Sequence, residues 1–210
     1  MHYTIFDTPV LSSLLYLVST TILKIFGWKK EGCLPDVSKY VVIAAPHTSN
    51  WDLPITMLVA FAFKTKIFWM GKDAIFRFPF GHIMRWLGGI HVDRSKSNNM
   101  VDQTIQAFNS HERLAIVVPP EGTRGKVRSW KTGFYYIAYG ANVPIALCFL
   151  DYDRKVGGVG PVFWPSGDIV TDMCVIREFY YGIRGKHPEK SSPADISPGS
   201  GYKNACMPRK

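Results

Sequence analysis

Three short runs of uninterrupted apolar residues constrain the fold of this chain most. Each run has the length of one strand, and together they cover Tyr40–Ala45, Leu114–Pro119 and Val143–Leu150. A strand that is apolar along its whole length is buried on both faces, as in parallel sheets covered by helices. Segments of helical character separate these runs, over residues 50–64, 98–110 and 130–139. The alternation predicts an α/β fold: a single domain with a mixed, largely parallel sheet flanked by helices.

Shorter signals complete the expected domain. We expect two further strands at Ile67–Gly71 and Gly89–Asp93, a helix between them broken by Pro79 and Gly81, strands and turns over residues 157–168, and a last helix at Thr171–Gly182. The chain has 210 residues, enough for one domain with a full core, which we place at residues 31–184. Residues 185–210 are rich in Ser, Pro, Gly and Lys and are expected to form a disordered tail.

The N-terminal segment, residues 1–30, predicts an amphipathic helix. Thr8 and Pro9 suit the N-cap and the first helical position, and the helical pattern continues to about Phe26. Its apolar face is formed by Leu11, Leu14, Leu15, Val18, Ile22, Ile25 and Phe26. The stretch is short for a membrane span and lacks the features of a secretory signal. We expect a membrane-interface helix with its lysines near the headgroups, at Lys24, Lys29 and Lys30. The alternative is a helix that covers the protein core.

Basic residues outnumber acidic ones. Lys and Arg number 25, Asp and Glu 16, and the formal net charge is +9. Such a charge attracts polyanions, either nucleic acid or an anionic lipid surface. The basic residues are not gathered into an arm or a block, so we expect no nucleic-acid partner. The cysteines lie far apart without a CxxC pair, so we expect reduced thiols and no metal site, at Cys33, Cys148, Cys174 and Cys206.

The candidate catalytic residues follow the first apolar run. His47 and Asp52 form a His-x4-Asp pattern directly after Pro46. A neutral histidine ring accepts a proton, and a carboxylate beside it fixes the tautomer of the ring, so the pair predicts a general base. No serine or cysteine nucleophile motif accompanies it, which favours a base that activates a substrate hydroxyl directly. In the alternative interpretation, Asp52 caps a helix and His47 is a packed side chain.

Two arginines follow predicted strands, at the edge where α/β sheets bind ligands. Arg94 ends the sequence Gly-Ile-His-Val-Asp-Arg, and Arg124 ends Pro-Glu-Gly-Thr-Arg, in which Gly122 permits a tight turn. Guanidinium groups at neighbouring strand ends suit a phosphate, which they bind bidentately. Alternatively, Arg94 pairs with Asp93 or another acid, and Glu121 is the structural partner of a basic residue.

Four sequence blocks resemble those of a known family. They are the His-x4-Asp at His47, a Gly-x-Ile-x-Val-Asp-Arg ending at Arg94, a Pro-Glu-Gly-Thr-Arg ending at Arg124, and a Val-Pro-Ile at residues 143–145. In this order, across about residues 40–150, they resemble the glycerolipid acyltransferases typified by 1-acyl-glycerol-3-phosphate acyltransferase. Flanking positions that depart from the better-known members, and that bear on acceptor specificity, are Pro46, Pro119, Ala146 and Leu147.

The resemblance implies a role for each site residue. His47 takes the proton from the acceptor hydroxyl as it attacks the thioester of an acyl donor, and Asp52 orients the ring. Arg94 and Arg124 hold the anionic head group of the acceptor, while Glu121 orders Arg124 or hydrogen-bonds an acceptor hydroxyl. The substrate-binding set implied by the resemblance comprises Arg94, Glu121, Gly122, Thr123, Arg124 and Lys131.

The function implied by the resemblance is a membrane-associated O-acyltransferase of phospholipid biosynthesis that acylates a lysophospholipid such as 1-acyl-sn-glycerol-3-phosphate. Its partners are the donor thioester, acyl-CoA or acyl-acyl carrier protein, the lysophospholipid and an anionic membrane surface; no cofactor or metal is expected. The protein is placed at the cytoplasmic face of the membrane, peripheral or monotopic. Two alternatives stay open: an acyltransferase for a lyso-aminolipid acceptor, and a non-catalytic lipid-binding protein, which has no need of the His-x4-Asp pair.

Overall fold

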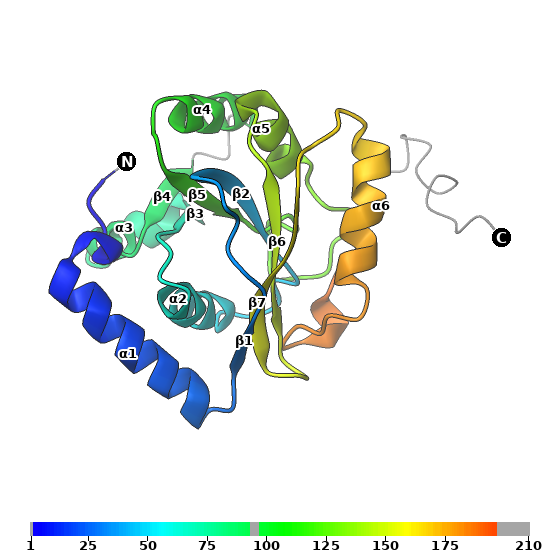
Figure 1. Ribbon diagram of the computed structural model, residues 1–210. Coiled ribbons are helices and arrows are strands. Elements are labelled where there is room, and N and C mark those ends of the chain that lie inside the picture. The colour runs from blue at the N-terminus through cyan, green and yellow to red at the C-terminus, as the bar shows by residue number, and fades with distance from the viewer. Residues whose placement is uncertain (1, 93–96, 197–210) are drawn as a thin grey trace.

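The computed structural model describes residues 2–92 and 97–196. Its strands are β1 (Lys29–Glu31), β2 (Lys39–Ala44), β3 (Phe68–Lys72), β4 (Gly89–Val92), β5 (Leu114–Val118), β6 (Ile145–Asp151) and β7 (Val156–Phe163). Within the described ranges they form one seven-stranded sheet in the order β1-β7-β6-β2-β5-β3-β4 (Figure 1). Neighbouring strands are parallel except β6 and β7, which are antiparallel. The predicted mixed, largely parallel sheet is confirmed.

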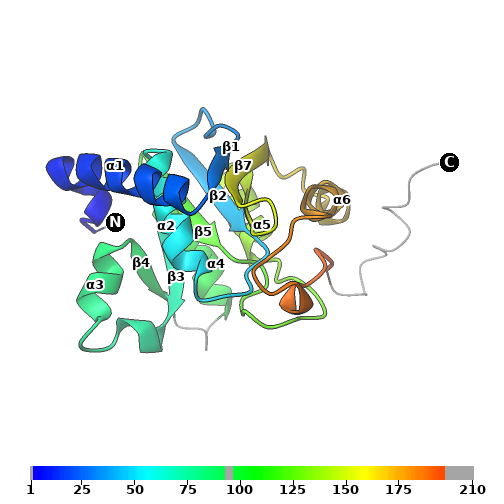
Figure 2. The ribbon, with the colours of Figure 1, turned by 90° about the horizontal axis from the view of Figure 1, so that it is seen from below.

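Helices cover both faces of the sheet (Figures 1 and 2). The α-helices are α1 (Pro9–Ile25), α2 (Asp52–Ala62), α3 (Gly81–Trp86), α4 (Ser97–Asn109), α5 (Gly133–Ala141) and α6 (Ile169–Tyr180); the short 3-10 helices are η1 (Ile5–Asp7), η2 (Asp73–Phe76) and η3 (Pro188–Lys190). One face is covered by α1, α2 and α3, and the other by α4, α5 and α6. The fold is therefore a three-layer α/β domain.

The central strand β2 shows how one sequence run builds two cores. Val41 and Ile43 point into the core shared with α4, α5 and α6, and both side chains are fully buried. Tyr40 and Val42, one residue away in each case, point into the core shared with α2. Successive side chains of a strand alternate between the faces of the sheet, so an uninterrupted apolar run is needed where both faces are covered.

Helix α1 has two apolar sides. It begins at Pro9 after Thr8, as predicted. Along one side, Leu11, Leu15 and Leu23 pack against the core, so the core-covering alternative is confirmed for this side. The opposite side leaves large apolar residues exposed, at Val10, Leu14, Leu17, Val18, Ile25 and Phe26. In the described part of the chain, no helix is both long enough and apolar enough to cross a membrane.

Three expectations differ from the structure. Strand β1 was not predicted; its residues are exposed, and it exists through parallel pairing with β7. Residues 185–196 were expected in a disordered tail, yet Ala194 and Ile196 are buried in the core under α5 and α6, and the amide of Trp130 donates to the carbonyl of Asp195 at 2.6 Å. Cys174 takes part in a disulfide bond, so the prediction of reduced thiols is wrong for it.

Candidate active site

The site lies where the central parallel strands end. His47 follows β2, Glu121 follows β5, and β2 pairs in parallel with both β5 and β6. The carboxyl ends of these three strands therefore meet at one edge of the sheet, the usual location of ligand sites in α/β folds. The Val-Pro-Ile block is placed elsewhere: Ile145 pairs with Val41 near the start of β2, at the opposite edge of the sheet.

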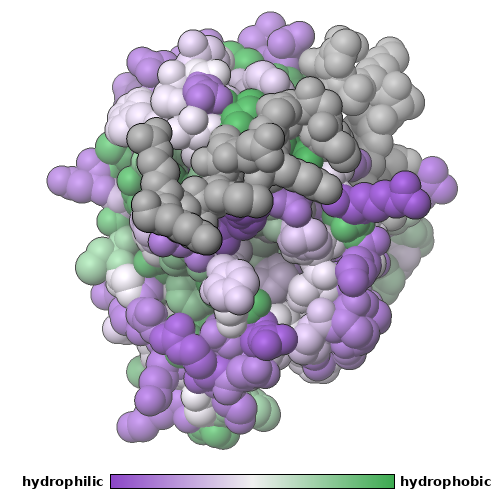
Figure 3. All heavy atoms as spheres, turned by 90° about the vertical axis from the view of Figure 1, so that its right-hand side faces the viewer, coloured by the Kyte–Doolittle hydropathy of each residue, from purple (hydrophilic) through white to green (hydrophobic). Residues whose placement is uncertain are grey.

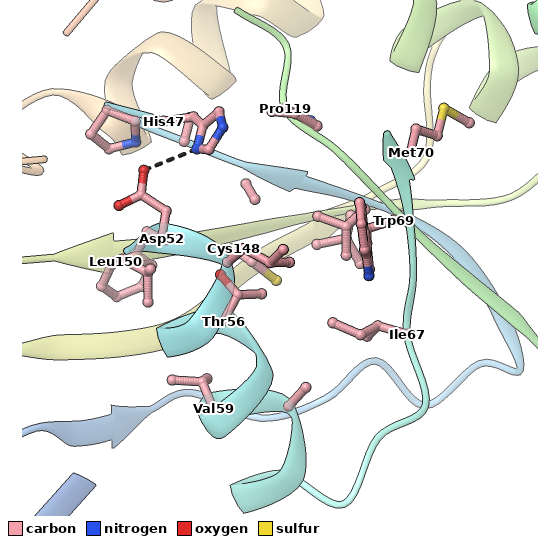
Figure 4. A pocket seen from close by; sticks show the side chains of 18 of the residues that line it. His47, Asp52, Thr56, Val59, Ile67, Trp69, Met70, Pro119, Cys148 and Leu150 are labelled. Atoms are coloured by element: carbon pink, nitrogen blue, oxygen red, sulfur yellow. Dashed lines mark hydrogen bonds and ion pairs between the residues drawn. The ribbon is translucent and has the colours of Figure 1, made fainter. Parts of the chain in front are cut away.

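His47 and Asp52 are hydrogen-bonded to each other. Nδ1 of His47 lies 2.9 Å from Oδ2 of Asp52, as the dashed line in Figure 4 marks. Asp52 is the first residue of α2 and is buried, while the His47 side chain is partly exposed. A carboxylate cannot donate when ionised, so Nδ1 carries the proton and Nε2 is left as the acceptor. The arrangement is that of a general base whose tautomer is fixed by a carboxylate.

Several donors converge on the carboxylate of Asp52. Oδ2 also accepts the backbone amides of Thr48 and Ser49, each at 2.9 Å, and Oδ1 accepts the hydroxyl of Tyr152 at 2.7 Å. Burial by itself raises the pKa of Asp52, but the hydrogen bonds from His47, Tyr152 and Ser49 outweigh burial and lower the pKa below its usual value. Asp52 therefore stays ionised, and its hydrogen bonds to backbone amides hold the loop that carries His47 in place.

Glu121 supports the backbone of His47. Its Oε2 accepts the amide of His47 at 2.6 Å, and its side chain is almost wholly buried. Burial raises the pKa of Glu121 to about 7, although the hydrogen bond from the His47 amide acts in the opposite direction. The carboxylate thus contacts the loop of the base, and no described contact joins it to Arg124.

The Pro-Glu-Gly-Thr-Arg loop places polar groups beside the base. Gly122 has a φ of 65°, a left-handed conformation that glycine adopts without strain, and a Cβ built there would meet the side chain of Lys131 at 3.1 Å. The aliphatic part of Lys131 therefore packs over Gly122. Arg124 donates to the side-chain oxygen of Asn50, and Thr123 accepts the amide of Gly125. Arg94 lies outside the described residues, so its predicted partnership with Arg124 stays a prediction.

An apolar cavity adjoins the base (Figure 4). Its volume is about 410 Å³, within the usual range for small-molecule sites. His47, Asn50 and Arg124 contribute polar groups to its lining, whereas most other lining residues are apolar. The apolar walls come mainly from β2, α2, β3 and β6, for example at Val42, Val59, Trp69 and Leu150. A cavity with this apolar lining suits an aliphatic group.

Sequence reasoning missed the cavity walls and Tyr152. The walls arise because α2 packs on the sheet without filling the space beneath it, which no local pattern reveals. Tyr152 offered one signal: it follows the predicted strand Val143–Leu150, at the same sheet edge as His47. Within the described residues, no group of three or more His, Cys, Asp or Glu side chains is placed to hold a metal ion.

The chain is similar to known proteins in its sequence pattern and in its fold. A protein-family model described as Acyltransferase matches residues 28–149, a range that includes His47, Asp52 and Arg124. Among solved structures, the fold is similar to that of the 1-acyl-sn-glycerophosphate (LPA) acyltransferase PlsC from Thermotoga maritima, with a TM-score of 0.52 and 17% sequence identity, over 75% of this chain and 70% of that chain. A search of curated proteins finds no match to this chain.

Proposed function

Because this chain belongs to the acyltransferase family, we propose that it transfers an acyl chain from a thioester to the hydroxyl of a lysophospholipid of the 1-acyl-sn-glycerol-3-phosphate type. The donor is acyl-CoA or acyl-acyl carrier protein. One observation carries the proposal: the hydrogen-bonded pair of His47 and Asp52 adjoins an apolar cavity. The similarity of fold to an LPA acyltransferase supports the choice of acceptor class.

The proposed reaction uses His47 twice. Nε2 of His47 takes the proton of the acceptor hydroxyl while the hydroxyl oxygen attacks the thioester carbonyl, and the charge on the resulting imidazolium is balanced by Asp52. When the tetrahedral intermediate collapses, the new C–O ester bond remains, the C–S bond breaks, and the departing sulfur takes up the proton from His47. Atoms and charge balance with the two substrates alone, so the proposal includes no cofactor.

Substrate placement follows from the chemistry of the lining. The apolar cavity suits the acyl chain of the donor, because burial of each CH₂ contributes about 0.8 kcal/mol. Arg124, together with Arg94, is proposed to bind the anionic head group of the acceptor, and Thr123 and Lys131 lie on the same loop. Binding of both substrates beside one base supplies proximity, which accounts for much of the rate of such transfers.

The proposed substrates are amphiphiles, and we propose that the protein docks on the cytoplasmic face of a membrane as a peripheral or monotopic protein. The outer side of α1 is exposed and apolar, and a second exposed apolar group follows η2, with Phe78 95% and Phe80 61% exposed. Surface patches of this kind mark interaction sites. The side that carries α6, seen in Figure 3, is instead largely hydrophilic where it is described.

A direct assay tests the proposal. Purified protein is incubated with a labelled acyl thioester and a panel of lysolipids that includes lysophosphatidate and a lyso-aminolipid, and the products are identified by mass. We expect acylated lysophosphatidate as the main product. A main product from the lyso-aminolipid would transfer the proposal to that acceptor, and binding of lipid without any product would support a non-catalytic lipid-binding protein.

A further inference from the structure

Tyr152 lies outside every sequence block described above and yet contacts the catalytic pair. It occupies the turn between β6 and β7, at the carboxyl end of β6. Its hydroxyl donates to Oδ1 of Asp52 at 2.7 Å. The matched family region ends at residue 149, just before this turn. The contact is therefore formed by a part of the chain that the family pattern does not include.

Three surrounding features hold Tyr152 in place. Its ring and that of Trp28 form a T-shaped pair, with ring centroids 5.1 Å apart and an interplanar angle of 87°. The amide of Tyr152 donates to the carbonyl of Arg184 at 2.9 Å. The turn itself is fixed by buried Asp151, whose Oδ1 accepts the next two amides along the turn, those of Asp153 and Arg154. A hydroxyl on such a support is preorganised toward its acceptor.

The hydroxyl of Tyr152 completes the hydrogen bonding of Asp52. Oδ2 of Asp52 accepts His47 and two backbone amides, whereas among the described residues Oδ1 accepts Tyr152 only. A carboxylate held at one oxygen rotates about its Cβ–Cγ bond, and rotation would carry Oδ2 away from Nδ1. A second donor at the other oxygen fixes the plane of the carboxylate.

We propose that Tyr152 is a positioning residue of the proposed acyl transfer: it fixes the carboxylate of Asp52 so that Oδ2 stays aligned with Nδ1 of His47. The expected effect on kcat rests on the proposed function, whereas the expected alignment of Asp52 with His47 does not. Tyr152 does not line the cavity and acts through Asp52. Its removal should therefore lower kcat while the KM values of both substrates stay unchanged.

The experiment compares Tyr152→Phe with Tyr135→Phe. Tyr135 is a matched control, because its hydroxyl also donates to a carboxylate at 2.7 Å, that of Asp172, but on the α5–α6 side of the sheet. For Tyr152→Phe we expect kcat to fall about 10-fold, the loss of one hydrogen bond to a charged group. Tyr135→Phe should lose thermal stability and keep the kcat of the unmodified protein.

The pH profile separates positioning from a general structural role. The titratable groups next to Asp52 are His47, Tyr152 and Glu121. Without the tyrosine donor, Oδ2 of Asp52 is aligned less well with Nδ1 of His47, so the carboxylate stabilises the imidazolium form of the ring less. The acidic limb of kcat/KM should then move to lower pH in Tyr152→Phe and stay in place in Tyr135→Phe. The proposal would be overturned if kcat fell equally in both variants and the acidic limb of kcat/KM stayed in place in both.

A measurement without substrate keeps this inference separate from the proposed function. In ¹⁵N spectra of the histidine rings, the Nδ1–H signal of His47 is assigned from its loss in His47→Ala. We expect this signal to shift or broaden in Tyr152→Phe and to stay unchanged in Tyr135→Phe. Identical spectra of the two variants would reject the positioning role, whereas a shifted signal in a protein without acyltransferase activity would reject only the proposed function.

Discussion

The two faces of the sheet are packed differently, although the same strands supply both. On the face under α4, α5 and α6, side chains such as Val41 and Phe134 are fully buried in a continuous core. On the face under α2, Val42 borders a cavity of about 410 Å³ that adjoins His47. Close packing provides the stability of a domain, whereas an unfilled space provides a binding site at some cost in stability. Stability and activity should therefore respond to substitutions on opposite faces.

The largest effect is expected at the base itself. His47→Ala should lower turnover by about 10²–10⁴-fold because the variant lacks the proposed general base. Asp52→Asn should also be severe, since the ring of His47 loses its orienting charge. The measurement is turnover together with thermal stability, and His111→Ala, on the α4 side, is the control. Near-normal turnover in folded His47→Ala protein would remove the base from the mechanism.

Protonation of Glu121 should make the free energy of unfolding depend on pH. Its pKa is about 7 in the folded protein against 4.5 for an ordinary glutamate, so the folded state binds this proton more tightly than the unfolded chain. The protonated side chain contributes fully to the free energy of unfolding below about pH 4.5. This contribution, of up to about 3 kcal/mol, is lost as the pH rises to about 7. Denaturant unfolding across this range should show a smaller decline in Glu121→Gln, which keeps the acceptor for His47. If the unfolding free energy declined equally with pH in the variant and in the unmodified protein, the raised pKa of Glu121 would be contradicted.

A pair of neighbouring valines tests the contrast between the faces most directly. Val41→Ala should cost about 2 kcal/mol of unfolding free energy, because it opens a cavity in a filled core. Val42→Ala should cost about half as much, since its methyl groups already border an unfilled space, and it should change the preferred length of the donor acyl chain. Unfolding midpoints and a series of donor thioesters measure both effects. Equal costs with unchanged chain preference would show that the two faces are equivalent.

Binding of the acceptor head group is expected to depend on Arg124. Arg124→Ala should raise the KM for the lysophospholipid about 10- to 100-fold and leave the KM for the thioester nearly unchanged. Arg128→Ala provides a matched control, because Arg128 is an exposed cation of the same loop that does not line the cavity. If both KM values rise equally, Arg124 does not bind the acceptor head group.

The smallest effect concerns the outer side of α1. Leu17 is 61% exposed there, so Leu17→Glu should leave the packing of Leu11, Leu15 and Leu23 intact. We expect binding to anionic vesicles to weaken about 10-fold, through lost apolar burial and added repulsion. Ser13→Glu, which adds the same charge at another exposed position of this helix, measures the repulsion alone. Equal vesicle binding by both variants would argue against insertion of this side.

The elements that were predicted correctly carry their signal locally. The runs that became β2, β5 and β6 are apolar because both faces of each strand are covered, and Pro79 and Gly81 mark the break between η2 and α3. His47, Asp52 and the turn at Gly122 follow from local spacing. The missed features depend on distant partners. Strand β1 requires β7, residues 185–196 require the core under α5 and α6, and the placement of Tyr152 depends on Trp28 and Arg184.

The segment after α6 has a consequence for how the protein is made. The carbonyl of Arg184 accepts the amide of Tyr152, and the amide of His187 donates to Thr48 in the loop that carries His47. Ser192 accepts the amide of Val127 in the loop between β5 and α5. On the ribosome, His47 and Asp52 emerge long before this segment. The nascent chain thus carries its reactive residues before the loops around them are held by this segment, and catalytic competence is acquired only after the segment has been translated.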